Sequence, residues 1–525
     1  MILQNLVFPK ENICNEPELY FHGTTDGKIP AGNEADLFTY FNSFSAYKWK
    51  MYTKIKEVRF RLRCKGSCMV RLWDAGVTGG TMALTENFTS ERHRQADPDE
   101  VSLSFSLADV KGIVYATVRA DSDTEILGGC FETVFEPIQL AKIAIGICTF
   151  RREEFVKKTL ETLKRETMEN PDSPLYQNVY VYVSDNGQTL PCEELSNDRI
   201  FVMPNRNTGG SGGFGRCMKE AYEDREKYGL THILLMDDDI VLEPESLFRT
   251  YTLLNFLKEE RKGAMLGGGL LRLDIPYIQH ANGELWQGGR IGFTKRGYDL
   301  RKMTDVVRNE YNLPMDYNGW WYCCVPLAEQ FRGFPLPIFI HGDDIEYGLR
   351  FDGNIMTMNG IGVWHDAFDN RKASSMEYYD MRNTLIACAI HHPKFSRLRM
   401  IKRVARHLIG QMLHLRVKDQ ELTMRGVEDF CKGTEFLKEL DPTKLHPEIM
   451  KMGYAMQDVS DDLHKFGVDV EKTKPQPSHL YEDGGFAKKH LLSVNGWLLP
   501  AKKETVVLPM GCLLYTSPSP RDVEE

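Results

Sequence analysis

The sequence lacks the features that mark several large classes of protein. No apolar run approaches the roughly 18 residues that a transmembrane helix needs. The first residues have no charged segment followed by a long apolar core, so we expect no secretory signal. Positive charge is in deficit, with 65 lysines and arginines against 74 aspartates and glutamates, which argues against a nucleic-acid partner. These absences predict a cytoplasmic globular protein.

Cysteine is also scarce, with 12 in 525 residues. No pair of Cys-x-x-Cys units occurs, which argues against a zinc ribbon. Most of the cysteines, such as Cys148, stand in apolar stretches. We therefore expect buried free thiols in a reducing compartment.

Several patterns follow one another along the chain. Residues 1–138 contain short runs of alternating apolar and polar residues, which predicts an antiparallel β-sandwich. In residues 139–392, apolar runs alternate with helical spacing, which predicts an α/β domain with a mostly parallel sheet. Residues 393–512 have a helical pattern. Residues 513–525 show no periodicity and resemble a translated vector junction, so we expect a non-native tail there.

The basic segment 394–418 has two interpretations. Leu398, Ile401 and Met412 fall on one helical face, among several lysines and arginines. A basic amphipathic helix of this kind can lie on an anionic membrane, here the inner face of the cell membrane. The alternative is a solvated face of a helix that packs on the protein. The sequence leaves both interpretations open.

The strongest chemical signal is Asp237-Asp238-Asp239, which directly follows the apolar run HILLM. Ligands bind at the carboxyl edge of a parallel sheet, and clustered carboxylates repel one another unless a cation lies between them. Alternate residues of an extended segment point the same way, so Asp237 and Asp239 are the pair expected to hold Mn²⁺ or Mg²⁺. The alternative is an acidic turn.

A second acidic pair, Asp343-Asp344, precedes a helix-like segment. A carboxylate in this position suits a general base, whereas the structural alternative is N-capping of the helix. The two roles are compatible if Asp343 caps or orients and Asp344 is the base. His365, after a short apolar strand, is either a third metal ligand or a structural histidine.

The glycine-rich segment 205–221 would either cradle a phosphate or sugar or form a plain turn. It lacks the Lys-Ser/Thr of a P-loop, and it follows the third predicted strand, which argues against a dinucleotide fold. Two further groups are candidates. Thr149, Arg151 and Asp185 follow predicted strands, where a nucleotide would bind. Trp320 and Trp321 precede the second acidic pair, and they either stack on sugar rings or pack in a core.

Together these residues resemble the family 2 glycosyltransferases of the GT-A type. The resemblance runs, in order, through Thr149-Phe150-Arg151, Asp185-Asn186, Asn207-Thr208-Gly209-Gly210, Asp237-Asp238-Asp239, Asp343-Asp344 and His365. More narrowly, NRNxGGSGGFxR, the WW pair, DDxEYGLR and VWH resemble the polymerising galactofuranosyltransferases of actinobacterial cell walls. In that family a β-sandwich precedes the GT-A domain and a helical region follows it.

The resemblance implies a metal-dependent, inverting transfer from UDP-galactofuranose to a glycan or lipid-linked glycan, by a chain that is expected to form a homo-oligomer. It implies these roles: Asp237, Asp239 and His365 for Mn²⁺ or Mg²⁺; Asp344, beside Asp343, for the general base; Thr149, Arg151, Asp185, Asn207, Gly209, Gly210 and Asp238 for the donor; Trp320, Trp321 and His341 for the acceptor. The chain has His341-Gly342 where that family places Lys-Trp, so the acceptor and the number of sugars added stay open.

Four rival functions are weighed against this one. A nucleotidyltransferase or phosphosugar enzyme needs a basic triphosphate loop, but only Arg206 and Arg216 flank the glycines. A GT-A enzyme for another nucleotide sugar would use the same metal and base. A non-catalytic carbohydrate-binding protein predicts that Asp344→Asn leaves function intact. A dinucleotide oxidoreductase conflicts with the position of the glycines.

Overall fold

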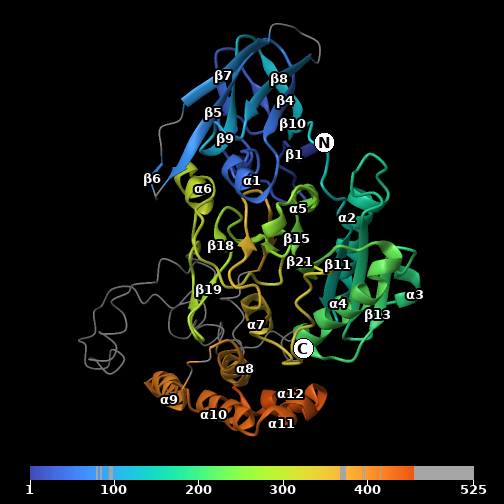
Figure 1. Ribbon diagram of the computed structural model, residues 1–525, viewed down its shortest axis with the longest axis vertical. Coiled ribbons are helices and arrows are strands. Elements are labelled where there is room, and N and C mark those ends of the chain that lie inside the picture. Colours follow the sequence, from blue (N-terminus) through green and yellow to red (C-terminus); the bar gives the residue numbers. More distant parts are fainter. Residues whose placement is uncertain are drawn as a thin grey trace, which may run out of the picture.

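The computed structural model describes residues 1–454 except 79–80, 83–85, 94–98, 367–373, 393, 395 and 414–415. Within these residues the chain passes from a β domain through an α/β domain to a helical region, from top to bottom of Figure 1. Residues 455–512 of the predicted helical region and the predicted tail 513–525 lie outside the described residues.

The β domain consists of two antiparallel sheets, which confirms the predicted sandwich. Their strand orders are β1-β10-β4-β8, with β2 beside β10, and β3-β9-β5-β6, with β7 beside β5. The strands are β1 (Ile2–Asn5), β2 (Lys28–Ile29), β3 (Glu34–Asp36), β4 (Glu57–Lys65), β5 (Cys68–Thr78), β6 (Thr81–Met82), β7 (Glu86–His93), β8 (Asp99–Ser106), β9 (Gly112–Ala120) and β10 (Thr124–Glu132). β4 buries Val58, Phe60 and Leu62 on one face, as its alternating pattern predicts.

The α/β domain is built on a seven-stranded sheet in the order β13-β12-β11-β14-β21-β16-β22. The strands are β11 (Ile143–Thr149), β12 (Val179–Asp185), β13 (Ile200–Pro204), β14 (His232–Asp237), β16 (Met265–Gly267), β21 (Cys323–Pro326) and β22 (Ile355–Met356). All neighbours pair in parallel except β21, which is antiparallel to β14 and β16. The mostly parallel sheet is therefore confirmed, and β11, β12 and β14 end at one edge.

Helices and a smaller sheet surround this core. The helices are α2 (Glu153–Leu163), α3 (Cys192–Leu195), α4 (Gly209–Tyr228), α5 (Pro244–Asn255), α6 (Met303–Asn309) and α7 (Asp343–Leu349). The smaller sheet has the order β15-β23-β17-β18, with β15 (Val241–Leu242), β23 (Gly362–His365), β17 (Gly269–Arg272) and β18 (Gln279–Ala281), and β19 (Leu285–Trp286) pairs with β20 (Ile291–Gly292). α4 begins at Gly209, so the glycines form its first turn instead of a separate loop.

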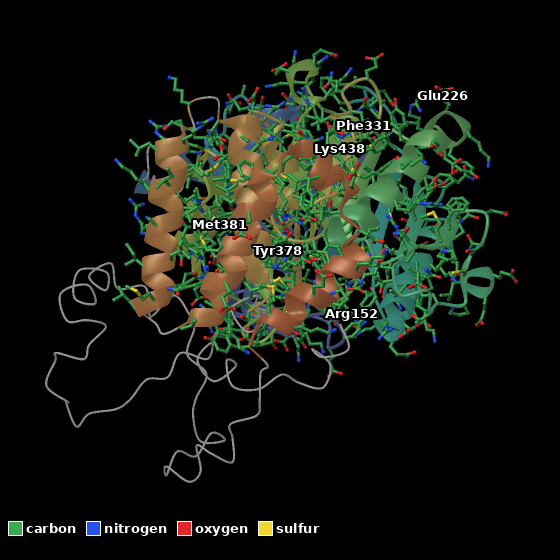
Figure 2. The ribbon with its side chains drawn as sticks, turned by 90° about the horizontal axis from the view of Figure 1, so that it is seen from below. Arg152, Glu226, Phe331, Tyr378, Met381 and Lys438 are labelled. Carbon is green, nitrogen blue, oxygen red and sulfur yellow. The ribbon has the colours of Figure 1, made fainter. Side chains whose placement is uncertain are left out.

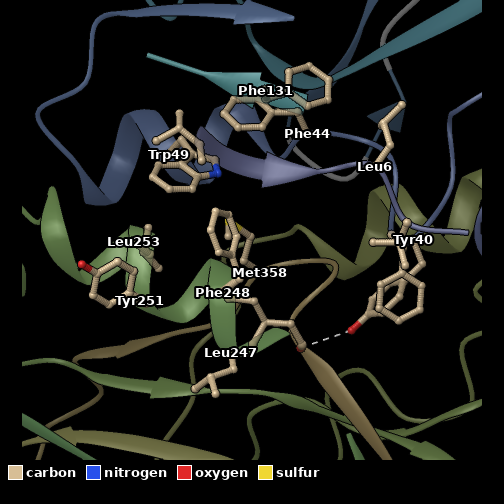
Figure 3. Packing of buried hydrophobic residues seen from close by; sticks show 14 of the residues in the cluster. Leu6, Tyr40, Phe44, Trp49, Phe131, Leu247, Phe248, Tyr251, Leu253 and Met358 are labelled. Atoms are coloured by element: carbon tan, nitrogen blue, oxygen red, sulfur yellow. Dashed lines mark hydrogen bonds between the residues drawn. The ribbon is translucent and has the colours of Figure 1, made fainter. Parts of the chain in front are cut away.

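A hydrophobic core runs across the boundary between the β domain and the α/β domain. Phe44 and Trp49 pack in the same cluster as Phe248 of α5 (Figure 3), and Trp49 lies within α1 (Ala46–Tyr52). Arg249 of α5 is fully buried and donates hydrogen bonds to the carbonyl groups of Asn5 and Phe41 at 3.1 and 2.8 Å. Apolar burial and satisfied polar groups therefore join the two domains.

The helical region lies below the α/β domain in Figure 1, and Figure 2 shows it from below, with Tyr378 and Met381 among its helices. It comprises α8 (Met376–His391), α9 (Arg397–Leu413), α10 (Val417–Cys431), α11 (Thr434–Glu439) and α12 (Pro442–Met452). On α9, Leu398, Ile401 and Met412 are 60%, 59% and 56% exposed, so its apolar stripe lies at the surface. Among the described helices, none combines the length and the hydropathy required to span a bilayer.

Candidate active site

A pocket of about 380 Å³ opens at the edge of the sheet where β11 and β14 end. Strand ends supply Thr149, Asp237 and Asp238, and the start of α4 supplies Gly209 and Gly210. Asn207, another predicted donor residue, also lines it. A second hollow of about 670 Å³ on the β domain is lined by residues between 16 and 28, none of which is a predicted site residue.

Asp239 makes two charged contacts at this edge. Its Oδ2 accepts a hydrogen bond from Nη1 of Arg152 at 2.8 Å, and its Oδ1 lies 3.0 Å from Nε2 of His365. His365 reaches this position because β15, directly after the aspartates, pairs with β23. The fold therefore brings together two of the predicted metal ligands that are far apart in sequence.

The cluster carries more negative charge than its own cations offset. Burial raises the pKa of Asp237 to about 7 and that of Asp238 to about 6, and repulsion from Asp239 adds to both shifts. Burial alone would lower the pKa of His365, but its hydrogen bond to Asp239 and the charge there raise it to about 9. Oδ2 of Asp238 is buried and has no hydrogen-bond partner within the described chain.

The oxygen and nitrogen atoms of this cluster are of the types that bind a divalent cation. Carboxylate oxygens suit Mg²⁺ and Mn²⁺, and an imidazole is acceptable to Mn²⁺. Within the described ranges, no three His, Cys, Asp or Glu side chains already surround one point. Instead, Arg152 and His365 hold the two oxygens of Asp239. A cation bound there would replace these ion pairs and take over the charge that they offset.

The second acidic pair occupies the first turn of α7. Gly342 is the N-cap residue, with φ of 76°, and no side chain caps the helix. Asp343 therefore does not cap α7, and its alternative role of orienting Asp344 stays a prediction. Oδ1 of Asp344 accepts a hydrogen bond from the Ile345 N–H at 2.8 Å. Burial and the charge of Asp343 raise the pKa of Asp344 to about 7. A carboxylate with this pKa can accept a proton near neutral pH.

The loop before α7 has a strained backbone that α8 holds in place. Phe339 and His341 have φ of 77° and 64°, a region that non-glycine residues rarely adopt. Asn383 of α8 donates hydrogen bonds to the carbonyl groups of Ile340 and His341 at 2.8 and 2.7 Å. These bonds fix the point where α7 begins, and with it the position of Asp344.

The start of α4 needs glycine because the chain approaches itself closely there. Gly209 has φ of 67°, and a Cβ added to it would lie 2.3 Å from the carbonyl oxygen of Phe339. That carbonyl accepts a hydrogen bond from the Ser211 N–H at 2.9 Å. The glycine motif therefore joins the donor side of the pocket to the loop that carries the second acidic pair.

Two predicted donor residues lie outside the pocket lining. The Asp185 carboxylate is buried and accepts hydrogen bonds from the backbone N–H groups of Gly187, Thr189 and Leu190 at 2.8–3.0 Å, so it shapes the turn after β12. Arg151 has an exposed side chain, whereas its neighbour Arg152 enters the pocket. Direct donor contacts by Asp185 and Arg151 stay predictions.

The predicted acceptor residues have different surroundings. Trp320 and Trp321 are only 5% and 7% exposed, and Nε1 of Trp321 donates to the Gly268 carbonyl at 2.9 Å. The ring of Trp320 packs edge-on against Phe214 at 5.3 Å. His341 is 45% exposed and pairs with Asp380 at 2.8 Å. Acceptor binding by these three residues stays a prediction.

Sequence reasoning missed several residues of the site. Arg152, Phe339, Ser375 and His446 line the pocket, and the last two belong to the helical region. No local motif marks Ser375 or His446, and the adjacent arginines gave no means of choosing Arg152 over Arg151. Outside the pocket lining, Glu284 is 1% exposed, neither of its carboxylate oxygens has a hydrogen-bond partner among the described residues, and burial raises its pKa to about 8.

Comparison with known proteins places this geometry in a family. Residues 6–133 match the family model "Galactofuranosyltransferase 2 N-terminal", and residues 144–304 match "Glycosyl transferase family 2". Galactofuranosyltransferase GlfT2 of Mycobacterium tuberculosis (strain ATCC 25618 / H37Rv) is 28% identical over 465 residues, which cover 82% of this chain and 70% of the relative. Galactofuranosyltransferase GlfT2 of Mycolicibacterium smegmatis (strain ATCC 700084 / mc(2)155) is 26% identical over 480 residues, 85% of this chain and 71% of the relative.

A likeness to a solved structure adds nothing to this assignment. The carbohydrate binding module CBM6cm-2 from Cellvibrio mixtus lichenase 5A is 10% identical and covers 26% of this chain and 100% of the module, with a TM-score of only 0.16. The two family matches, the similarity along most of the chain and the acidic end of β14 on a mostly parallel sheet lead to one conclusion: the chain is a glycosyltransferase with a family 2 domain on a fold of the GT-A type.

Proposed function

We propose that this glycosyltransferase moves galactofuranose from UDP-galactofuranose to a hydroxyl group of a glycan or lipid-linked glycan. The observation that carries the choice of sugar is the similarity to galactofuranosyltransferases, which extends over the β domain as well as the α/β domain. Asp237 and Asp238 line the pocket at the sheet edge, and the charge of Asp237 acts on nearby Asp343, which supports the same reaction.

Asp344 is the general base of the proposed reaction. It accepts the proton of the acceptor hydroxyl as that oxygen bonds to the anomeric carbon. The bond between the anomeric carbon and UDP breaks at the same time, and UDP leaves with the bonding electrons. A single displacement inverts the anomeric centre and needs no nucleophilic side chain. Asp343, which is buried beside Asp344, raises the pKa of the base through its charge.

Family 2 glycosyltransferases generally use a divalent metal ion. In our proposal Asp237, Asp239 and His365 hold Mn²⁺ or Mg²⁺, and the bound ion offsets the charge that develops on the diphosphate. Arg152, which contacts Asp238 and Asp239 and lines the pocket, would contact the donor phosphates.

The donor lies against the strand ends and the start of α4. Thr149, Asn207 and the backbone of Gly209 and Gly210 face it from the pocket wall. A helix N-terminus with no acidic residue in its first turn favours a phosphate group. We also propose that Asp238, Asp185 and Arg151 bind the donor. The acceptor is proposed to bind at Trp320, Trp321 and His341. Assembly into a homo-oligomer is a further part of the proposal.

Peripheral contact with a membrane is part of the proposal, through residues 394–418. The exposed residues Leu398, Ile401 and Met412 of α9 lie on one helical face, and basic residues flank them. We expect sedimentation with anionic phosphatidylglycerol vesicles and less binding by Ile401→Glu. Leu140→Glu, at an exposed leucine outside the helical region, is the control. Equal binding by all three proteins would exclude this surface.

The function is tested by the release of UDP from a panel of UDP-sugars, with Mn²⁺ and with EDTA, in the presence of a galactan acceptor. We expect metal-dependent release from UDP-galactofuranose alone. Release from another UDP-sugar only would keep the family 2 chemistry and discard galactofuranose. Product stereochemistry, read by NMR of the new linkage, would show inversion.

A further inference from the structure

The helical region forms one wall of the donor pocket. Ser375, just before α8, and His446 of α12 line the pocket together with the strand ends. We propose that Ser375 and His446 bind the diphosphate of the nucleotide sugar. This inference rests on the proposed use of a nucleotide-sugar donor, but it does not depend on which sugar the donor carries.

Ser375 has a polar atom that the protein leaves unused. Its side chain is 2% exposed, and Oγ has no hydrogen-bond partner within the part of the chain that the structure describes. A buried hydroxyl without a partner lowers stability, so native proteins rarely keep one. Because Ser375 lines the pocket, a bound ligand that offers an acceptor oxygen would satisfy it.

His446 is fixed in the pocket wall by two neighbours. Nδ1 lies 3.0 Å from the hydroxyl group of Tyr379, and the imidazole ring packs on Phe339 at 5.0 Å between centroids. Burial lowers the pKa of His446, so the ring is neutral at pH 7. In the tautomer in which the Tyr379 hydroxyl donates to Nδ1, Nε2 carries the hydrogen and is a donor. No hydrogen bond of Nε2 with another described residue is observed.

Donors on the other side of the pocket indicate which part of the ligand these groups meet. The 20-residue helix α4 begins at Gly209, and its first turn has no acidic residue. The positive end of the helix favours an anion. Ser375 and His446 add two neutral donors to the same pocket. A group rich in acceptor oxygens satisfies all of them, and in a nucleotide sugar that group is the diphosphate.

The wall has a defined position because the helical region packs on the loop before α7. Phe339 shares a hydrophobic cluster with Tyr379 and with Leu445 and Ile449 of α12, which flank His446 in sequence. The carbonyl group of Phe339 accepts the hydrogen bond from Ser211 of α4. One residue therefore joins both walls, and the spacing between the two sets of donors is built into the fold.

The test is calorimetric titration of the full chain with UDP in the presence of Mn²⁺, which needs no sugar and no acceptor. Ser375→Ala removes only the unpaired hydroxyl, and His446→Phe keeps the ring on Phe339 but removes both nitrogens. The loss of one hydrogen bond to a charged group corresponds to about tenfold weaker binding. We therefore expect Kd for UDP to rise about tenfold in each variant.

The control is His407→Phe, which removes a histidine that pairs with Glu377 on the helical region away from the pocket lining. It should bind UDP as the wild type does. Thermal unfolding separates folding from binding, because Ser375→Ala should match or exceed the melting temperature of the wild type. Wild-type affinity in both variants would overturn the inference and leave the proposed function standing. No UDP binding by the wild-type chain would overturn both.

Discussion

Two acidic groups stand near the sheet edge, and they are built in different ways. The first stands at the end of β14, where Asp239 is held by Arg152 and His365. The second stands at the start of α7, where Asp344 has a backbone hydrogen bond and lies beside another carboxyl group. Both groups contain a carboxyl group whose pKa is raised to about 7. Only Asp239 of the first group is held by both Arg152 and His365, which a metal ion would replace.

The difference shows how similar side chains acquire separate tasks. The end of a buried strand is a rigid support, which suits ligands that must keep a fixed distance from a metal ion. The α7 pair lies on a strained loop that Asn383 holds from α8, so its position depends on the helical region. Cation binding should therefore depend on the β14 group, and turnover on the α7 group.

The largest effect is expected from Asp344→Asn. Loss of the general base should lower the transfer rate by about 10²–10⁴-fold. Affinity for UDP and Mn²⁺ should stay unchanged, because Asp344 is outside the β14 group. Initial rates with UDP-galactofuranose and acceptor measure this, with Asp352→Asn, at an exposed aspartate after α7, as the control. Near-normal turnover by Asp344→Asn would assign the base to another residue.

Asp239→Asn should disturb the other acidic group. Because one carboxylate ligand loses its charge, we expect the Mn²⁺ concentration for half-maximal activity to rise about 100-fold. A titration of activity against Mn²⁺ measures the shift, and Asp198→Asn, at an exposed position, is the control. An unchanged Mn²⁺ requirement would contradict the proposed metal site.

The pH dependence should report the α7 group. Burial and the charge of Asp343 raise the pKa of Asp344 to about 7, so the base becomes protonated as the pH falls through 7. We expect the rate at saturating donor and metal to drop about tenfold for each pH unit below that value. The profile should rise with pH and then level off. A rate that stays constant down to pH 5 would show that proton acceptance by Asp344 does not limit turnover.

Asn383→Ala should have the smallest effect. It removes the hydrogen bonds that Asn383 donates to the carbonyl groups of Ile338, Ile340 and His341 and the one that it accepts from Arg382. A hydrogen bond has a net value of about 1 kcal/mol. We expect a stability loss of about 1–3 kcal/mol and a modest fall in kcat, with KM for the donor almost unchanged. Denaturant unfolding and steady-state kinetics measure the two effects. A change confined to KM would show that the loop acts on donor binding instead.

The sequence predicted the parts of the site that depend on local patterns. Continuous apolar runs identified β11 and β14, and Asp237–Asp239 follow the second run directly, so their place at the sheet edge could be foreseen. The start of α4 was harder to predict, because a run of glycines suggests a loop. The structure instead has a helix that begins at Gly209. Its glycines are needed because close contacts, such as that between Gly213 and Cys148, exclude larger residues.

The other residues of the site come together through tertiary contacts. His365 lies beside Asp239 only because β15 pairs with β23, which no local pattern records. Ser375 and His446 enter the pocket through the packing of α8 and α12 against Phe339. The apolar stripe of α9 was visible in the sequence, but only the structure shows that Leu398 and Ile401 are exposed while Val404 is buried.

The central claim is that the β14 group binds the cation and the α7 group accepts the proton. It is tested most directly by titrating UDP with Mn²⁺ into Asp239→Asn and Asp344→Asn side by side. We predict that Asp344→Asn, although inactive in transfer, binds UDP with the wild-type affinity, whereas Asp239→Asn loses the Mn²⁺-dependent part of the binding. Equal losses of affinity in the two variants, or a loss in Asp344→Asn alone, would contradict the account.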